Sequence, residues 1–233
     1  MRDSDVSAES QAEQPKARAA LYIDGFNLYH AIDDLAQPHL KWLNYWKLGE
    51  IIIPKQTEEL VRVTYCTAYY PGDPKKKWRH EQVIGAQKVF GVDVVLGHYV
   101  REDMDCRACG NQWQKPTEKE GDINVAIHLL RDGFLDHYDH AYLLTADSDQ
   151  AATARMFNEQ FPNKRLTSVV PPRRQPSVHI TNYTDKRKIA LNDLHLERCV
   201  MPQVVFKPGV ANTRRPNEYA PPNGWVHPDQ RPK

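Results

Sequence analysis

The stretch Leu21-Tyr22-Ile23-Asp24-Gly25-Phe26-Asn27 decides the fold. A short β-branched and aromatic run that stops at an acid and a glycine is typical of a buried strand followed by a tight turn. Open α/β sheets place their functional groups at the carboxyl ends of such strands. We therefore expect a strand over 19–24 that carries the Asp24 carboxylate to the edge of a sheet, and a helix from Phe26 to about Leu35 after it.

Strands and helices alternate along the chain beyond this stretch. Runs of strand-forming residues predict further strands over 61–70, 92–100, 140–146 and 166–170. Apolar residues at helical spacing predict further helices over 42–53, 75–90, 118–131 and 148–161. Parallel neighbours need a crossover, which is usually a helix. The order therefore favours an α/β fold, a single domain with a mainly parallel central sheet covered by helices on both faces.

The helix over 118–131 is predicted from the spacing of its apolar residues. Ile123, Ala126, Ile127 and Leu130 recur at intervals of three and four residues, which is the mark of an amphipathic helix. This spacing predicts that these four residues form the buried side of the helix.

Three segments stand outside the alternation. Residues 1–18 are polar and lack periodicity, which predicts a disordered leader. Residues 101–117 interrupt the rhythm around Cys106-Arg107-Ala108-Cys109-Gly110 and are expected to form a loop excursion. Residues 203–233 are rich in proline and poor in core residues, which predicts a flexible tail. The folded domain is then expected over 19–202.

Composition narrows the class of protein. The chain carries 31 basic and 30 acidic residues, a formal net charge of +1, so any contact with nucleic acid must come from local patches. Four cysteines are too few for a disulfide scaffold in a chain of 233 residues. With no signal-peptide core and no long apolar span, we expect a soluble, cytoplasmic protein with no membrane partner. The oligomeric state stays open, a homo-oligomer included.

Four acids follow strands or open helices of the expected sheet, and they are Asp24, Asp122, Asp147 and Asp149. Taken singly, each has a structural explanation as a turn residue, a helix cap or a first-turn acid. Taken together at one edge of a sheet, they would repel one another unless a cation lay between them. Oxygen-rich sites suit Mg²⁺ or Mn²⁺.

The chemistry that matches such a site is metal-assisted phosphodiester hydrolysis. Phosphomonoester hydrolysis would use the same geometry. The haloacid-dehalogenase pattern, however, needs a second Asp two residues after the first, and Phe26 stands there.

On these residues the chain resembles the NYN domain family, a PIN-like metal-dependent ribonuclease fold that includes the bacterial LabA-like proteins. Three ordered motifs carry the resemblance, and they are Tyr22-Ile23-Asp24-Gly25-Phe26-Asn27-Leu28, Glu118-Lys119-Glu120-Gly121-Asp122-Ile123-Asn124-Val125-Ala126 and Leu143-Leu144-Thr145-Ala146-Asp147-Ser148-Asp149. The Cys106 to Gly110 element also looks like a part of this family. The resemblance covers residues 19–202.

The resemblance implies a PIN-like fold with a metal site formed by Asp24, Asp122, Asp147 and Asp149. It further implies that Asn27 orients a carboxylate or a water, with Glu118 as a weaker candidate for the site. Two positions depart from the family pattern: Ala146 stands where glycine is usual, and Gln150 where an apolar residue is usual. We expect Gln150 to affect packing or substrate approach more than metal binding.

Basic residues near the expected edge suggest how RNA would reach the acids. Lys76 and Lys77 precede Trp78, and Arg173 and Arg174 follow the strand over 166–170. Such side chains contact phosphates, while Tyr69, Tyr70 or Trp78 would stack unpaired bases. A solvated helix face explains the lysines equally well.

Cys106 and Cys109 have the spacing of half a zinc site, but a complete site needs four ligands and the sequence has no second close pair. A reduced or loop-closing pair is favoured over zinc. The sequence therefore predicts a metal-dependent endoribonuclease that hydrolyses RNA with Mg²⁺ or Mn²⁺. The alternative is an RNA-binding regulatory module that keeps the acids and cleaves weakly or not at all.

Overall fold

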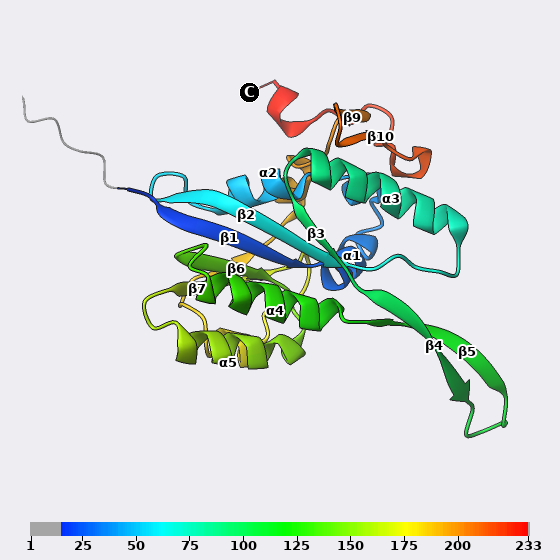
Figure 1. Cartoon of the computed structure of the whole chain (residues 1–233). Helices are drawn as coiled ribbons and strands as arrows, with labels where there is room; N and C mark the ends of the chain where they lie inside the picture. Colours follow the sequence, from blue (N-terminus) through cyan, green and yellow to red (C-terminus); the bar gives the residue numbers. More distant parts are fainter. Residues whose placement is uncertain (1–14, 233) are drawn as a thin grey trace, which may run out of the picture.

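A six-stranded, all-parallel sheet forms the centre of the computed structural model, which describes residues 15–232 (Figure 1). Its strand order is β3-β2-β1-β6-β7-β8. The strands are β1 (Ala17–Asp24), β2 (Glu58–Thr67), β3 (Asp93–Leu96), β6 (His140–Leu144), β7 (Arg165–Val170) and β8 (Lys188–Ala190). The central strand β1 pairs with β2 on one side and β6 on the other. The expected parallel sheet is confirmed, with the opening stretch at its middle.

Seven α-helices lie within the described residues. They are α1 (Gly25–Asp33), α2 (Tyr45–Ile52), α3 (Pro74–Val89), α4 (Gly121–Phe134), α5 (Ala151–Gln160), α6 (Val178–Thr181) and α7 (Asp193–Glu197). Short 3₁₀ turns η1 (Pro38–Lys41) and η2 (Ser148–Gln150) precede α2 and α5. No helix among residues 15–232 has the length and apolarity that a membrane crossing requires.

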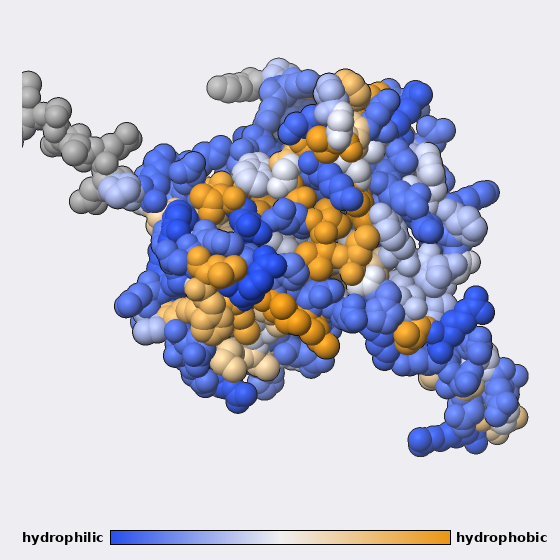
Figure 2. Space-filling model, in the orientation of Figure 1, coloured by the Kyte–Doolittle hydropathy of each residue, from blue (hydrophilic) through white to orange (hydrophobic). Residues whose placement is uncertain are grey.

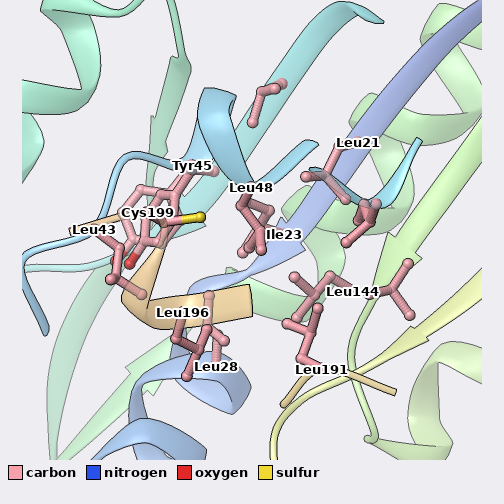
Figure 3. Packing of buried hydrophobic residues seen from close by; sticks show 14 of the residues in the cluster. Leu21, Ile23, Leu28, Leu43, Tyr45, Leu48, Leu144, Leu191, Leu196 and Cys199 are labelled. Carbon is pink, nitrogen blue, oxygen red and sulfur yellow. The ribbon is translucent and has the colours of Figure 1, made fainter. Parts of the chain in front are cut away.

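Both faces of β1 are buried, which explains its continuous apolar run. Leu21 and Ile23 belong to the core on the side of α1, α2 and α7, where Leu48 packs against them (Figure 3). Ala20 and Tyr22 point to the other face and join the core with α4 and α5. Strands covered on both sides of a parallel sheet read as near-continuous hydrophobic runs. The expectation of helices on both faces is therefore confirmed.

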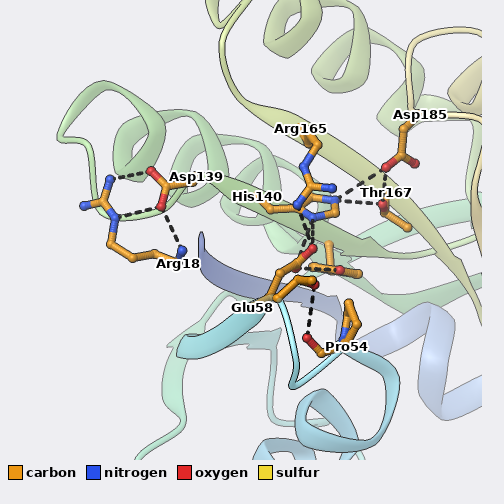
Figure 4. Close-up of polar contacts among 10 residues, drawn as sticks. Arg18, Pro54, Glu58, Asp139, His140, Arg165, Thr167 and Asp185 are labelled. Carbon is orange, nitrogen blue, oxygen red and sulfur yellow. Dashed lines mark hydrogen bonds and ion pairs between the residues drawn. The ribbon is translucent and has the colours of Figure 1, made fainter. Parts of the chain in front are cut away.

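A buried polar network joins the amino ends of β2, β6 and β7, at the edge of the sheet opposite to Asp24 (Figure 4). The Glu58 carboxylate accepts hydrogen bonds from Tyr142 (2.8 Å) and Arg165 (2.6 Å) and lies 3.0 Å from His140 Nδ1. Burial alone would raise the pKa of Glu58, but these partners hold it below its usual value. The charge is buried at low cost because its oxygens are paired.

The expected helix forms as α4, but it begins at Gly121 rather than at Glu118, which belongs to β5, and its expected apolar face is not the buried one. Val125 and Leu129 are the residues that enter the core, whereas Ile123 and Ile127 are 60% and 53% exposed. Figure 2 shows apolar side chains on the surface over this helix. The side that enters the core also carries Asp132, whose buried carboxylate accepts from the Tyr22 hydroxyl at 2.9 Å. Because Asp132 is charged, the buried side of α4 does not stand out as apolar in the sequence.

The expected loop over 101–117 is instead an antiparallel hairpin of β4 (His98–Asp105) and β5 (Gln112–Lys119). It projects from the body of the domain (Figure 1). The expected strand over 92–100 is accordingly split at Gly97 into β3 and β4. A Cβ on Gly97 would lie 2.5 Å from the Lys119 carbonyl oxygen, so the close crossing of the two strands requires glycine.

The expected flexible tail was also wrong. Residues 204–214 form a hairpin of β9 (Val204–Lys207) and β10 (Ala211–Arg214), followed by turns η3 (Asn217–Tyr219) and η4 (Pro228–Gln230). Val205 and Tyr219 are buried in a cluster with Val83 of α3. The tail therefore packs against apolar residues of α3 in a shared buried cluster.

Only the end of the expected leader falls within the described residues. Ala17 and Arg18 belong to β1, so the strand begins two residues before its expected start. Arg18 pairs with Asp139 at 2.7 Å (Figure 4). Residues 1–14 lie outside the described part of the chain.

Candidate functional site

Asp24 ends β1 and caps α1, and its side chain is held by two neighbours. Its Oδ1 accepts from the Asn27 backbone N–H and its Oδ2 from the Thr145 hydroxyl, each at 2.9 Å. The residue is 4% exposed. Gly25 makes the turn, because a Cβ there would lie 2.4 Å from the Cys66 carbonyl oxygen. The strand, the turn and the cap together fix the Asp24 carboxylate at the carboxyl edge of the sheet.

Asn27 joins this carboxylate to the segment after β6. Its side-chain oxygen accepts from the Ala146 backbone N–H at 2.9 Å. Ala146 is not among the residues with a left-handed backbone, so the glycine usual in the family is not required for its conformation. Asn27 therefore positions the segment that carries the next acid rather than a carboxylate directly.

Asp147 and Asp149 follow β6 through the 3₁₀ turn η2. The Asp147 backbone N–H donates to the Thr145 hydroxyl oxygen at 3.1 Å, and its Oδ1 accepts from the Asp149 N–H at 3.0 Å. Thr145 thus contacts both Asp24 and the backbone of Asp147. The Thr145 hydroxyl therefore links the end of β1 to the turn after β6.

Gln150 ties this turn to α4, a role that residue spacing did not indicate. The side chain is 2% exposed. Its Nε2 donates to the Asp122 carbonyl at 2.7 Å, and its Oε1 accepts from the Thr153 hydroxyl at 2.8 Å. The link fixes the first turn of α4, and with it Asp122, against the turn that carries Asp147. The departure from the family pattern at this position was the one signal that pointed to it.

Burial and neighbouring acids raise the pKa values of Asp24 and Asp122. Burial raises the pKa of Asp24 to about 6 against the effect of its two hydrogen bonds, and the charges of Asp122 and Asp147 add to the shift. Burial also raises the pKa of Asp122, with Asp147 and Asp149 contributing. The structure thus brings these four predicted residues into one electrostatic cluster at the edge of the sheet.

Glu118 belongs to the same cluster more closely than its sequence position suggested. Burial raises its pKa, and Asp122 and Asp24 add to the shift. Its Oε1 is buried and has no hydrogen-bond partner among the described residues. It lies over the start of α4, where a Cβ on Gly121 would be 2.8 Å from that oxygen. An unpaired buried carboxylate oxygen is costly unless something positive contacts it.

These five carboxylates suit a divalent cation in their chemistry. Mg²⁺ or Mn²⁺ prefers hard oxygen donors and would neutralise the charge of Asp24, Glu118 and Asp122, whose pKa values are raised. Within residues 15–232, however, no three His, Cys, Asp or Glu side chains stand close enough together to ligate one ion. The acids therefore converge on one region without closing a ligand set.

A cavity of about 720 Å³ opens beside the cluster. It is lined by Glu118, which is one of the acids, and by Gly25, which follows Asp24. Its other lining residues are Phe26, Tyr29, His30, Ile32, Lys41, Tyr45, Tyr65, Thr67, Ala68, Tyr70, Lys76, Arg79, His80, Val83, Tyr99, Lys115, Pro116, Thr117 and Tyr219. They come from the central sheet and its loops, α1, η1, α2, α3, the projecting hairpin and the ordered tail.

The walls of the cavity are aromatic and cationic. The Tyr99 ring lies 5.6 Å from that of Tyr70 and 6.0 Å from that of Phe26, centroid to centroid. The Lys76 ammonium lies 5.5 Å from the centre of the Tyr70 ring. Such walls suit a flat ring that carries a negative charge.

His80 lies at the base of the cavity and is neutral at pH 7. Burial lowers its pKa to about 4. Its Nε2 lies 3.2 Å from the Thr67 hydroxyl and 3.4 Å from the Tyr65 hydroxyl. It therefore contributes a neutral polar group rather than a charge.

The other predicted basic residues lie apart from the cavity. Lys77 pairs with Glu81 at 3.9 Å, Arg173 lies 3.8 Å from Asp193, and Arg174 pairs with Asp34. Of the predicted phosphate-binding residues, Lys76 alone lines the cavity.

Cys106 and Cys109 occupy the turn between β4 and β5, at the end of the hairpin remote from the sheet (Figure 1). Both are free thiols. No third metal-ligating side chain of the described residues joins them.

Comparisons with known proteins agree with this architecture. A solved structure of a protein of unknown function from Vibrio parahaemolyticus is similar, with a TM-score of 0.53 and 19% identity, over 78% of this chain and 97% of that one. That similarity is one of fold. The 6-hydroxy-3-succinoylpyridine 3-monooxygenase of Pseudomonas putida is 24% identical, over 87% of this chain and 75% of that protein.

A model of the NYN domain matches residues 18–186. The match spans most of the chain and includes Asp24, Glu118, Asp122, Asp147 and Asp149. The chain therefore belongs to the NYN domain family, whose members are generally nucleases.

Proposed function

We propose that the chain is a metal-dependent endoribonuclease that hydrolyses RNA phosphodiester bonds at the carboxylate cluster. The observation that carries the proposal is the convergence of acids from β1, β5, α4 and η2 on one edge of the sheet, beside an aromatic and cationic cavity. Membership of a nuclease-like family supports it. The cluster would hold Mg²⁺ or Mn²⁺ through Asp24, Glu118, Asp122, Asp147 and Asp149.

A bound cation would supply an activated water and neutralise charge on the phosphate. The chain's own residues would set the geometry around it. Asp24 is held by Thr145 and the start of α1, and Gln150 holds Asp122 against the turn after β6. These hydrogen bonds and the turn at Gly25 join the elements that carry the acids at one edge of the sheet.

The cavity would bind the nucleotides next to the scissile phosphate. Tyr99 and Tyr70 offer ring faces for unpaired bases, and Lys76 and Lys115 have no carboxylate partner among the described residues, so both are available to phosphates. Bases inside a duplex are stacked and cannot enter such a cavity. The proposal therefore favours single-stranded RNA.

The test is cleavage of matched single-stranded and hairpin RNAs with Mn²⁺, with Mg²⁺ and with chelator. The variant Asp24→Asn removes the most buried acid. Glu159→Gln makes the same change of charge on the exposed face of α5 and serves as the control. We expect metal-dependent cleavage by wild type and Glu159→Gln only. Cleavage that survives chelator or Asp24→Asn would overturn the proposal, and binding without cleavage in every reaction would favour a regulatory RNA-binding module.

The cavity favours one other candidate function, oxygenation of a small heteroaromatic acid. The Pseudomonas putida relative is named for a pyridine that bears a succinoyl chain. A flat ring with an acidic chain would suit aromatic walls with Lys76 at the rim. The test is uptake of dioxygen with hydroxypyridine acids and reduced nicotinamide as electron donor. Uptake that Tyr99→Ala abolishes, with no cleavage of RNA by wild type, would favour this candidate.

A further inference from the structure

The tip of the β4–β5 hairpin presents two thiols in a closed turn. Cys106 follows β4 directly, and its backbone N–H donates to the Asn111 carbonyl at 2.8 Å. The Gly110 N–H donates to the Cys106 carbonyl at 2.7 Å. Gly110 has φ of +70°, a left-handed conformation that only glycine adopts freely, so it closes the turn immediately after Cys109.

Cys106 and Cys109 lie three residues apart within this turn, which the two backbone hydrogen bonds close. The backbone N–H and then the thiol of Cys109 lower the pKa of Cys106, and the Ala108 N–H adds to the effect. Backbone N–H groups aimed at a cysteine sulfur stabilise its thiolate, which is the form that binds metal. The closed turn and the Cys-x-x-Cys spacing are those of one half of a four-thiolate zinc site.

The other half is missing from this chain. A structural zinc site takes four ligands. Among residues 15–232 no third Cys, His, Asp or Glu side chain stands with the two thiols. The hairpin also points away from the rest of the domain, so its tip is open to a second molecule (Figure 1).

The surface next to the thiols suits contact with an identical tip. Met104 and Trp113 are cross-strand partners two and four residues from the cysteines, and Trp113 is 45% exposed. Charges of both signs lie around them: Asp103 and Asp105 are acidic, and Arg107 and Lys115 are basic. Two copies would therefore meet with apolar contact and without a net excess of like charge.

We propose that Cys106 and Cys109 of two copies of this chain together hold one Zn²⁺ ion, as a four-thiolate site on a two-fold axis between hairpin tips. Each copy contributes the same two ligands, so the interface closes on itself as a dimer. The dimer would also steady the hairpin at its other end, where β5 carries Glu118 to the carboxylate cluster. The proposal does not depend on the reaction at that cluster.

The test uses the full chain purified under reducing conditions. Zinc content is measured by elemental analysis, and molar mass by light scattering during gel filtration. We expect one zinc for every two chains and a dimer that a strong chelator converts to monomer. Cobalt substituted for zinc should give the intense absorption of sulfur-to-metal charge transfer. Cys106→Ser and Cys109→Ser should each lose zinc and run as monomers with unchanged circular dichroism.

Two controls separate this proposal from its alternatives. Asp105→Asn changes the tip without removing a thiol and should keep both zinc and the dimer. His98→Gln, at the base of β4, should do the same. Zinc bound one to one by a monomer, loss of zinc in His98→Gln, or a reduced protein that binds no zinc would each overturn the proposal.

Discussion

Replacing Asp24 by Asn should stabilise the metal-free protein above neutral pH. The pKa of Asp24 is about 6 in the folded state and about 3.8 in the unfolded chain. The folded state therefore binds the proton more tightly. The stability that this gives is fully present below about pH 4 and is lost as pH rises through about 6.

The magnitude follows from the size of the shift. A difference of about two pKa units is worth about 3 kcal/mol at pH 8, because each unit is about 1.4 kcal/mol. Asparagine carries no charge but fits the Thr145 and Asn27 donors less well, at a cost of about 1 kcal/mol. The net expectation is a variant more stable than wild type by about 2 kcal/mol at pH 8 and no more stable at pH 4.

The assay is urea unfolding of both proteins in chelator at pH 4, 6 and 8, repeated with saturating Mg²⁺. Mg²⁺ should stabilise wild type and leave Asp24→Asn nearly unchanged, because a ligand that binds only the folded state adds to its stability. A variant less stable than wild type at pH 8 in chelator would refute the reasoning. It would mean that Asp24 acts as a helix cap rather than as a repelled acid.

Three further outcomes test other parts of the structure. Glu58→Ala should lower the free energy of unfolding by about 3 kcal/mol in urea titrations, because the buried His140 and Tyr142 lose their polar partner; a loss under about 1 kcal/mol would contradict the network. Gln150→Ala should weaken Mg²⁺ binding measured by calorimetry by roughly 10- to 100-fold, as expected for a residue that positions a ligand; unchanged affinity would contradict its role. Tyr99→Ala should weaken binding of single-stranded RNA, measured by fluorescence anisotropy, by about 10-fold or more. The Mg²⁺-induced rise in Tm should remain, and its loss would mean that the ring acts on the carboxylate cluster instead.

The central sheet could be predicted because its strands are buried on both faces. An apolar run such as Leu21 to Ile23 has few other solutions, and an acid that ends such a run must lie at the edge of the sheet. The positions of Asp24, Asp147 and Asp149 follow from that reasoning alone. Their convergence with Asp122 needed the connection through Gln150, which no spacing rule indicates.

The hairpin, the tail and the cavity could not be predicted, for different physical reasons. The strands β4 and β5 pair with each other and contain no fully buried residue, so they lack the apolar alternation that marks a strand. The tail is ordered by contacts such as Tyr219 with α3, which join residues far apart in the chain. The cavity is lined by side chains from both segments, so its position could not be predicted without knowing how these segments pack.

We propose that the carboxylate cluster cleaves RNA with a divalent metal. The most direct measurement is the initial rate at which wild type and Asp24→Asn cut one single-stranded RNA at saturating Mn²⁺, with folding of both confirmed by circular dichroism. The account predicts a rate for the variant at least about 100-fold lower, since even residues that only orient metal ligands cost 10- to 100-fold. Equal rates for the two proteins would contradict it.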